Sequence, residues 1–210
     1  MGLIENNSKT RIFLGISHGK ITRRVPGEEA YQQYEAFEGN LRKVEERLAD
    51  LPGAGKVRFV DFTFAEGDVD YVLSVQLSSS ILRSIIFSLA SIQDFKGNLI
   101  RINPYLSRDG QYTNISVYNN GAQVKWAIEA KQIPPVKVVQ LGTTEAKDDA
   151  DRVEFVRNYI KLVQQRLAAG SADEAPAAPD MPEAGIPSEE DMPDMGAGYG
   201  PGFFGEPEHI

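Results

Sequence analysis

The sequence predicts a mainly β domain with a few helices, followed by a long acidic tail. Most of the first 167 residues divide into short runs in which apolar and polar residues alternate, the pattern of half-buried strands. Two stretches, 78–92 and 148–167, instead carry apolar residues at helical spacing. Residues 168–210 hold ten acidic residues, no Lys or Arg, and seven of the twelve prolines. Such a segment cannot bury enough apolar surface to offset the entropy of ordering, so we expect a disordered tail after a domain at 1–167.

Charge is segregated between these two parts. All 22 Lys and Arg lie in residues 1–167 beside 20 acidic residues, so the domain has a net charge of +2 and the tail one of −10. The overall charge of −8 would argue against nucleic-acid binding if it were spread evenly. Because the acidity sits in a separate tail, that objection does not apply to the domain.

The first predicted element is a hairpin formed by residues 10–16 and 20–25, joined by a SHGK turn. Charged side chains on the second strand either protect a solvated sheet edge or contact phosphates, and both interpretations stay open. The basic residues of this strand are Lys20, Arg23 and Arg24.

Residues 28–51 are ambiguous. Tyr31, Tyr34, Leu41 and their neighbours recur at near-helical spacing among good helix formers. Gly39 interrupts that pattern, and the same residues could form a long bent strand with a bulge at Gly39. The order of the surrounding elements favours a strand from about 34 to 46.

In most of the remaining domain, apolar and polar residues alternate clearly. Runs 56–64 and 69–77 predict a hairpin, and Ser78 to Ser80 offer the cap of the helix that follows. Three further strands are predicted around the turns Asp109-Gly110 and Asn120-Gly121. We place Trp126 in the core, because it shares parity with Val124 and Ile128, and Arg83 on a solvated helix face. The predicted later elements are strands at 98–107, 112–118, 121–130 and 136–141, and the helix at 148–167.

Catalysis has little support in the sequence. The chain has no cysteine, which excludes disulfides, thiolate metal sites and cysteine nucleophiles. Its two histidines, His18 and His209, stand apart from any nucleophile or metal motif. The PGAGK stretch lacks the spacing of a P-loop and continues with Val57 instead of Ser or Thr. We therefore predict no enzyme activity, no cofactor and no metal. Four carboxylates that fit a solvated hairpin tip better than a cation site are Asp61, Glu66, Asp68 and Asp70.

A basic and aromatic strand face is the stronger candidate. Between residues 98 and 128 the non-core parity carries Arg101, Tyr105, Tyr112, Tyr118 and Lys125, with Asn103, Asn114 and Ser116 between them. Tyrosine rings can stack on bases, at ~1–3 kcal/mol per base, while cations contact phosphates. Alternatively, a tyrosine on such a face caps the core with its hydroxyl in water. The residues expected to extend the positive path are Lys20, Arg23, Arg24, Lys56 and Arg58.

Taken in order, the strands, the helix between the third and fourth of them, and the hairpin after it match a five-stranded OB-fold barrel. An N-terminal hairpin and a C-terminal helix would be additions to it. The sequence resembles the OB-fold single-stranded DNA-binding proteins of bacteriophages and their bacterial hosts. Over most of residues 11–160 the resemblance rests on LGISHGKITRR, FEGNL, YVLSVQLSSSILRSIIFSL, INPY, VYNNGAQVKW and IPPV.

This resemblance implies non-enzymatic, largely sequence-independent binding of single-stranded DNA in replication, recombination or repair, in the cytoplasm (of the host, for a phage protein). It also implies an acidic tail that recruits partner proteins, with Tyr199, Phe203 and Phe204 as anchors, although GEPEHI follows the two phenylalanines here. A homo-oligomer is compatible with it. No apolar run of ~18 residues predicts a membrane span. The rival interpretation is a scaffold module whose tyrosines contact another protein.

Overall fold

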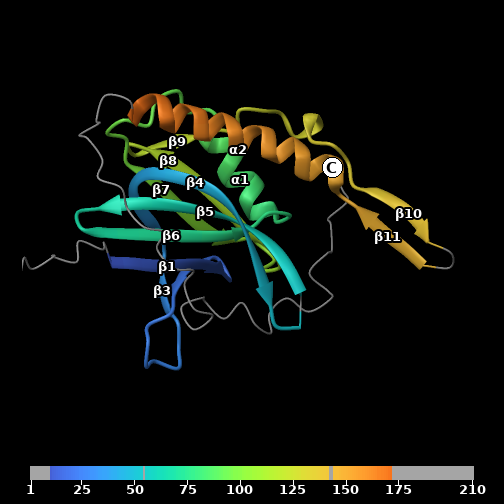
Figure 1. Ribbon diagram of the computed structural model, residues 1–210, viewed down its shortest axis with the longest axis horizontal. Helices are drawn as coiled ribbons and strands as arrows, with labels where there is room; N and C mark the ends of the chain where they lie inside the picture. The colour runs from blue at the N-terminus through green and yellow to red at the C-terminus, as the bar shows by residue number, and fades with distance from the viewer. Residues whose placement is uncertain (1–9, 54, 142–143, 172–210) are drawn as a thin grey trace, which may run out of the picture.

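The computed structural model describes residues 10–53, 55–141 and 144–171 (Figure 1). These residues form a nine-stranded sheet, a separate two-stranded sheet and two α-helices. In the large sheet the strand order is β3-β2-β1-β6-β5-β4-β7-β8-β9. The elements are β1 (Thr10–Ser17), β2 (Lys20–Arg23), β3 (Gln32–Tyr34), β4 (Phe37–Leu51), β5 (Gly55–Glu66), β6 (Val69–Gln76), α1 (Ser80–Leu89), β7 (Ile100–Leu106), β8 (Thr113–Asn119), β9 (Ala122–Val124), a 3-10 turn (Ala130–Gln132), β10 (Lys137–Leu141), β11 (Thr144–Asp148) and α2 (Ala150–Ser171).

The predicted N-terminal hairpin is confirmed. Strands β1 and β2 pair antiparallel, with Leu14 opposite Arg23, and the turn between them uses positive φ angles at His18 (49°) and Gly19 (71°). Strand β1 also pairs parallel with β6, so that Leu14 lies beside Leu73. This parallel pairing attaches the hairpin to the rest of the sheet.

The ambiguous stretch forms strands, so the helical alternative is wrong. Strand β4 runs on to Leu51, beyond the predicted end. Its irregularity lies between Leu41 and Lys43, not at Gly39. Gly39 has a different role, because a Cβ atom there would lie only 3.2 Å from both the Phe37 ring and the Phe64 Cβ. Glycine therefore allows close packing of these two aromatic residues.

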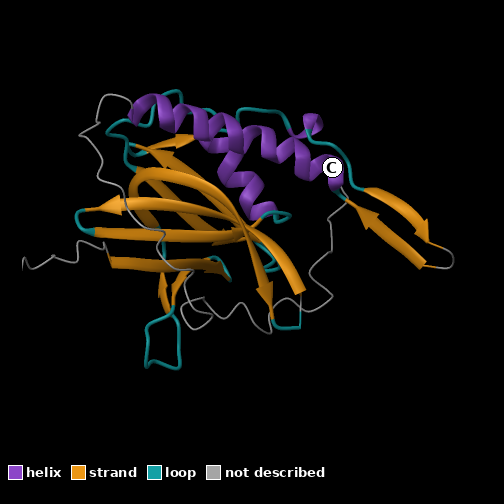
Figure 2. Cartoon of the chain, viewed as in Figure 1, coloured by secondary structure: helices purple, strands orange, loops and turns teal. Residues whose placement is uncertain are grey.

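Both predicted helices are confirmed, and in Figure 2 they lie together at one side of the sheet. The Ser79 hydroxyl accepts a hydrogen bond from the Leu82 backbone N–H (3.1 Å) and caps α1. Helix α2 reaches Ser171 instead of ending at 167. Its last turns stay attached to the domain, since Arg166 donates to the carbonyl of Ile92 (2.7 Å). The buried core side chains of the two helices include Leu82, Ile85, Ile86, Leu89, Val156, Ile160, Val163 and Leu167.

The large sheet curls but does not close into a barrel. Its edges are β3 and β9, and no backbone ladder joins them among the described residues. The β1–β2 turn nevertheless reaches the end of the β7–β8 hairpin, where the Gly19 N–H donates to the Thr113 hydroxyl (3.1 Å). The observed fold is thus mainly β with two α-helices around a curled, open sheet.

Two parts of the predicted C-terminal half are wrong. The strand expected at 121–130 ends at Val124, and Trp126 follows it with 39 % of its surface exposed. Its ring packs edge-on against Phe87 (5.5 Å between centroids) instead of entering the core. The short strand β10 has an unpredicted partner, β11, and together they form an arm that projects from the body (Figure 1).

We predict that Gly19→Ala destabilises the domain by ~1–3 kcal/mol more than Gly67→Ala. Both glycines have positive φ, so the backbone strain of alanine is similar. A Cβ atom on Gly19 would lie 2.8 Å from the Leu106 nitrogen, whereas one on Gly67 meets nothing within 4 Å. Urea unfolding of both variants measures the difference. Equal losses would show that contact between the β1–β2 turn and β7 contributes little.

Candidate nucleic-acid interface

The register of β7 and β8 places the predicted strand residues on one face. Arg101 lies opposite Tyr118, and Tyr105 lies opposite Asn114. Antiparallel partners share a face, so these four side chains point to the same side of the sheet. Asn103 and Ser116 form the row between them. The alternate residues Ile100, Ile102 and Val117 are buried in the core, which confirms the predicted parity.

The tyrosines of this face are accessible to different degrees. Tyr105 is 46 % and Tyr112 39 % exposed, while Tyr118 is half-buried. Tyr112 precedes β8 and is held by two hydrogen bonds with Ser107. Its N–H donates to the Ser107 hydroxyl (2.9 Å), and its carbonyl accepts from the Ser107 N–H (2.8 Å). The Ser107 hydroxyl and the Gln111 N–H also lower the pKa of Asp109 in the same turn.

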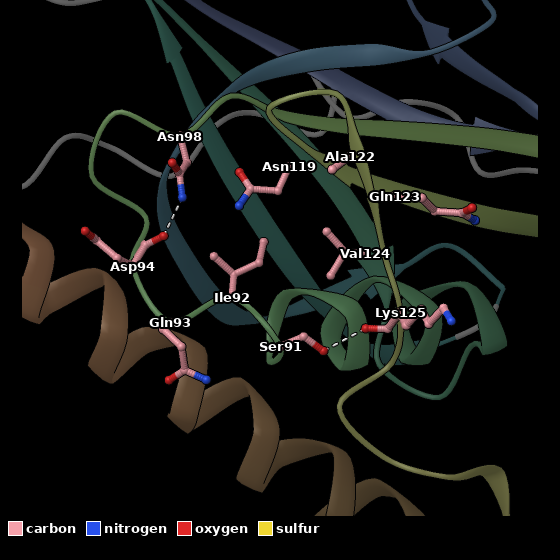
Figure 3. A pocket seen from close by; sticks show the side chains of 10 residues that line it. All are labelled: Ser91, Ile92, Gln93, Asp94, Asn98, Asn119, Ala122, Gln123, Val124 and Lys125. Carbon is pink, nitrogen blue, oxygen red and sulfur yellow. Dashed lines mark hydrogen bonds between the residues drawn. The ribbon is translucent and has the colours of Figure 1, made fainter.

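Lys125 lies one residue beyond β9, where its carbonyl accepts a hydrogen bond from the Ser91 hydroxyl (2.7 Å). It borders an open pocket of about 530 Å³ between the end of α1 and strands β8 and β9. Figure 3 shows the side chains of Gln123 and Lys125 pointing away from this pocket. Gln123 is the register partner of Tyr118, so it extends the Arg101–Tyr118 row toward Lys125.

One acidic residue interrupts this face. Glu38 on β4 lies directly beside Arg101, and both side chains are exposed. The sequence contained no signal for this neighbour, because the β4–β7 pairing joins residues far apart in the chain. The face therefore combines tyrosines, amides and cations with one carboxylate at its β4 side.

The basic residues of β2 are not brought to one face. Lys20 pairs with Ser17 and Arg23 with the core residue Leu14, so their side chains leave opposite sides of the strand. Lys20 also forms an ion pair with Glu35 (2.5 Å). Lys20 follows Gly19, which contacts the end of β7, whereas the exposed Arg24 lies beyond β2.

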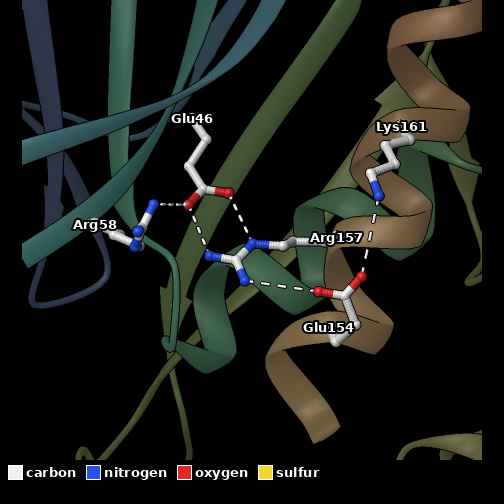
Figure 4. A network of polar contacts seen from close by, with 5 residues as sticks. All are labelled: Glu46, Arg58, Glu154, Arg157 and Lys161. Carbon is white, nitrogen blue, oxygen red and sulfur yellow. Dashed lines mark hydrogen bonds and ion pairs between the residues drawn. The ribbon is translucent and has the colours of Figure 1, made fainter. Parts of the chain in front are cut away.

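The last predicted pair, Lys56 and Arg58, lies at the other end of β4. Strand β4 meets β7 through residues 37–39 but places Asp50 beside Lys56. Arg58 donates to Glu46 (2.9 Å), which also accepts two hydrogen bonds from Arg157 of α2 (Figure 4). Arg157 first, and Arg58 after it, lower the pKa of Glu46, and the pKa of Arg157 is raised in turn. Arg58 thus helps to join the sheet to α2.

The structure also corrects the placement of Asp61, which the sequence assigned to a solvated hairpin tip. Asp61 is only 5 % exposed and accepts a hydrogen bond from Arg47 Nε (2.8 Å). The Arg47 guanidinium lies over the Phe59 ring, 5.5 Å from its centroid. Ser74, the register partner of Asp61, is buried as well. This polar pair belongs to the packing of β4, β5 and β6.

Over the described ranges, no group of three His, Asp or Glu side chains is placed to hold a metal ion, and no helix is long and apolar enough to cross a membrane. His18 Nδ1 is 2.8 Å from the Ser17 hydroxyl in the β1–β2 turn. Tyr199, Phe203, Phe204 and His209 lie outside the described residues.

Comparisons with protein-family models, curated proteins and solved structures found no match to this chain. The candidate face combines aromatic, amide and cationic side chains. Tyrosine rings can stack on planar bases, amides can donate and accept hydrogen bonds, and cations can neutralise phosphates. Arg101 and Lys125 form no ion pair with any residue in the described part of the chain, unlike Lys20 and Arg58.

We predict that Glu46→Gln lowers the free energy of unfolding by about 2 kcal/mol at pH 7. The pKa of Glu46 is depressed below 4.5 in the folded protein, so its stabilising contribution is present above that value. The contribution is lost as pH falls through the depressed pKa. Urea unfolding at pH 7, 5 and 3 should therefore show the wild type and variant converging at the acid end.

Glu45→Gln is the matched control for this experiment. Glu45 neighbours Glu46 on β4, but its ion pair with Lys43 is exposed, with 47 % of the Glu45 side chain accessible. Such pairs contribute ~0–1 kcal/mol. Equal effects of the two substitutions would contradict a special role for the Glu46–Arg157 contact.

Proposed function

We propose that the β7–β8 face binds single-stranded DNA without sequence specificity, and that the protein acts in DNA replication, recombination or repair as a binding protein and not as an enzyme. The observation that carries this proposal is the shared face of Arg101, Tyr105 and Tyr118. A single-strand binder needs ring surfaces for bases and cations for phosphates, and this face offers both along two adjacent strands.

The strand arrangement supports a partly open OB-type barrel as the framework of this function. Strands β4, β5, β6 and β7 follow one another in the chain, with α1 between the third and the fourth. They are neighbours in the sheet in the order β6-β5-β4-β7. In this proposal the N-terminal β1, which pairs parallel with β6, supplies the fifth strand. The contact of Gly19 with Thr113 then takes the place of a closing ladder.

The proposed DNA path follows the tyrosines. It begins near Lys20 at the β1–β2 turn, passes Tyr105 and Tyr112, crosses Tyr118 and ends at Lys125. Arg101 neutralises a phosphate in the middle of this path. Lys56, Arg58, Arg23 and Arg24 would be reached only by DNA that continued around the sheet, and they have no part in the central contact.

In this proposal the tail competes with DNA for the cations of the path and also binds partner proteins. Ten negative charges tethered beside a weakly positive domain can occupy the cationic positions of the path when DNA is absent. In this proposal Tyr199, Phe203 and Phe204 bind replication or recombination proteins once DNA displaces the tail. The tail's own position lies outside the described residues.

We predict that Tyr112→Ala combined with Tyr118→Ala weakens binding of labelled oligo-dT at least ~30-fold, from ~1–3 kcal/mol per stacked base. Fluorescence anisotropy at several salt concentrations measures the affinity. Tyr34→Ala is the control, because Tyr34 is similarly exposed (42 %) but lies on the edge strand β3. An unchanged affinity of the double variant would contradict stacking of bases on these two tyrosines. Absence of binding by the wild type would favour the scaffold interpretation.

Removing residues 172–210 should raise the affinity for oligo-dT several-fold at low salt, with a smaller gain near physiological salt. The physical reason is that tethered carboxylates compete with phosphates for the same cations. A full-length variant with every acidic residue of the tail changed to Asn or Gln separates charge from length and should behave like the truncated chain. A lower affinity for oligo-dT after truncation, or a gain in affinity that does not depend on salt, would contradict competition between the tail and DNA.

A further inference from the structure

The arm formed by β10 and β11 has no role in the proposed DNA path. Its two strands pair only with each other among the described residues, and the arm projects away from the large sheet (Figure 1). Val138 and Val139 on it are 60 % and 40 % exposed. An isolated two-stranded hairpin is marginally stable in water, whereas three or more strands are stable. The arm therefore has the properties of an element that gains strands from a partner.

Two polar contacts join the base of the arm to α2. Lys137, at the start of β10, forms an ion pair of 2.6 Å with Asp151 in the first turn of α2. This contact raises the pKa of Lys137. Arg152 Nε donates to the carbonyl of Pro134 (2.8 Å), just before β10. The start of the arm is thus joined to the first turns of α2 by one exposed ion pair and one hydrogen bond to the backbone.

The two faces of the arm differ. Val139 lies opposite Ala146 on one face, and on the other face Val138 lies opposite Lys147 and Gln140 opposite Glu145. The outer edge of β11 has no strand partner in the described part of the chain. Along that edge the order is Glu145, Ala146, Lys147, so the two charges of opposite sign are placed symmetrically about Ala146.

We propose that the arm is a self-association element, in which β11 pairs antiparallel with β11 of a second copy, centred on Ala146. Pairing in this register places Glu145 of each copy opposite Lys147 of the other. The contact is isologous, as a two-fold axis requires. Glu145, which accepts a hydrogen bond from Gln140 within the arm (2.8 Å), would then also have a cation opposite it in each copy. This inference does not depend on DNA binding.

The same register also joins the apolar residues. Val139 and Ala146 of one copy lie in line with Ala146 and Val139 of the other. The four residues form one apolar row across a four-stranded sheet. Pairing through β10 instead, centred on Val139, would place Val138 opposite Gln140 and would match no charges. Charge complementarity therefore favours the β11 edge.

The contact involves only short strands, so we expect weak association in solution. Interfaces of this size belong to the transient class. Two copies on one DNA strand would meet at a much higher effective concentration, and the same contact would then link neighbours along the strand. Wild-type protein alone should still show reversible dimers by sedimentation equilibrium between ~10 µM and ~1 mM.

Charge reversal tests the register directly. Glu145→Lys alone or Lys147→Glu alone places like charges opposite each other and should raise the dimer dissociation constant about tenfold or more. A 1:1 mixture of the two single variants restores opposite charges at both positions, so it should associate better than either variant alone. The double variant Glu145→Lys/Lys147→Glu should dimerise like the wild type. Asp68→Lys, at the exposed β5–β6 turn, is the control for net charge.

Monomeric wild-type protein across the whole range would overturn the proposal and assign the arm to another partner. Single variants that dimerise as well as the wild type, or a mixture that associates no better than its components, would also overturn it. Thermal unfolding of each variant separates these outcomes from loss of fold. The measurements contain no DNA, so their result and the result with oligo-dT are independent.

Discussion

The shape of the large sheet depends on the place where the pairing between β4 and β7 ends. Among the described residues the two strands pair only from Phe37 to Gly39, after which β4 continues along β5 and its other edge has no strand partner there. Helix α2 covers this edge, because Gln164 donates to the Val44 carbonyl (2.8 Å) and Arg157 forms its paired hydrogen bonds with Glu46. The open sheet therefore has a gap beside β4, where a closed barrel would have a paired strand. Helices fill this gap, and their side chains form hydrogen bonds with β4.

This arrangement decides which surface is available for binding. Because the apolar residues of α1 and α2 pack into the core, the opposite face of β7 and β8 keeps Arg101, Tyr105 and Asn114 exposed. The β1–β2 turn touches the far end of the same hairpin through Gly19. The candidate face is consequently bounded by the turn at one end and by Lys125 at the other.

Local alternation was sufficient to predict most strands and the parity of the β7–β8 face, because period-two patterns depend on neighbours along the chain. Contacts between distant segments were not predictable in this way. The parallel β1–β6 pairing, the burial of Asp61 against Arg47, and Glu38 beside Arg101 all join segments far apart in sequence. Strand β11 was missed because its polar sequence, TEAKD, lacks an apolar alternation.

Net charge alone does not identify the cations that could meet DNA. The domain carries +2 overall, but Lys20, Arg58 and Lys137 each have a carboxylate partner. A cation that must give up a carboxylate partner to bind a phosphate contributes less binding free energy than a cation that has no such partner. Arg101 and Lys125 have no such partner within the described residues, and they lie on the face that carries the exposed tyrosines. Accessible tyrosine rings and cations that are not held in internal ion pairs of the described residues therefore coincide on this one face.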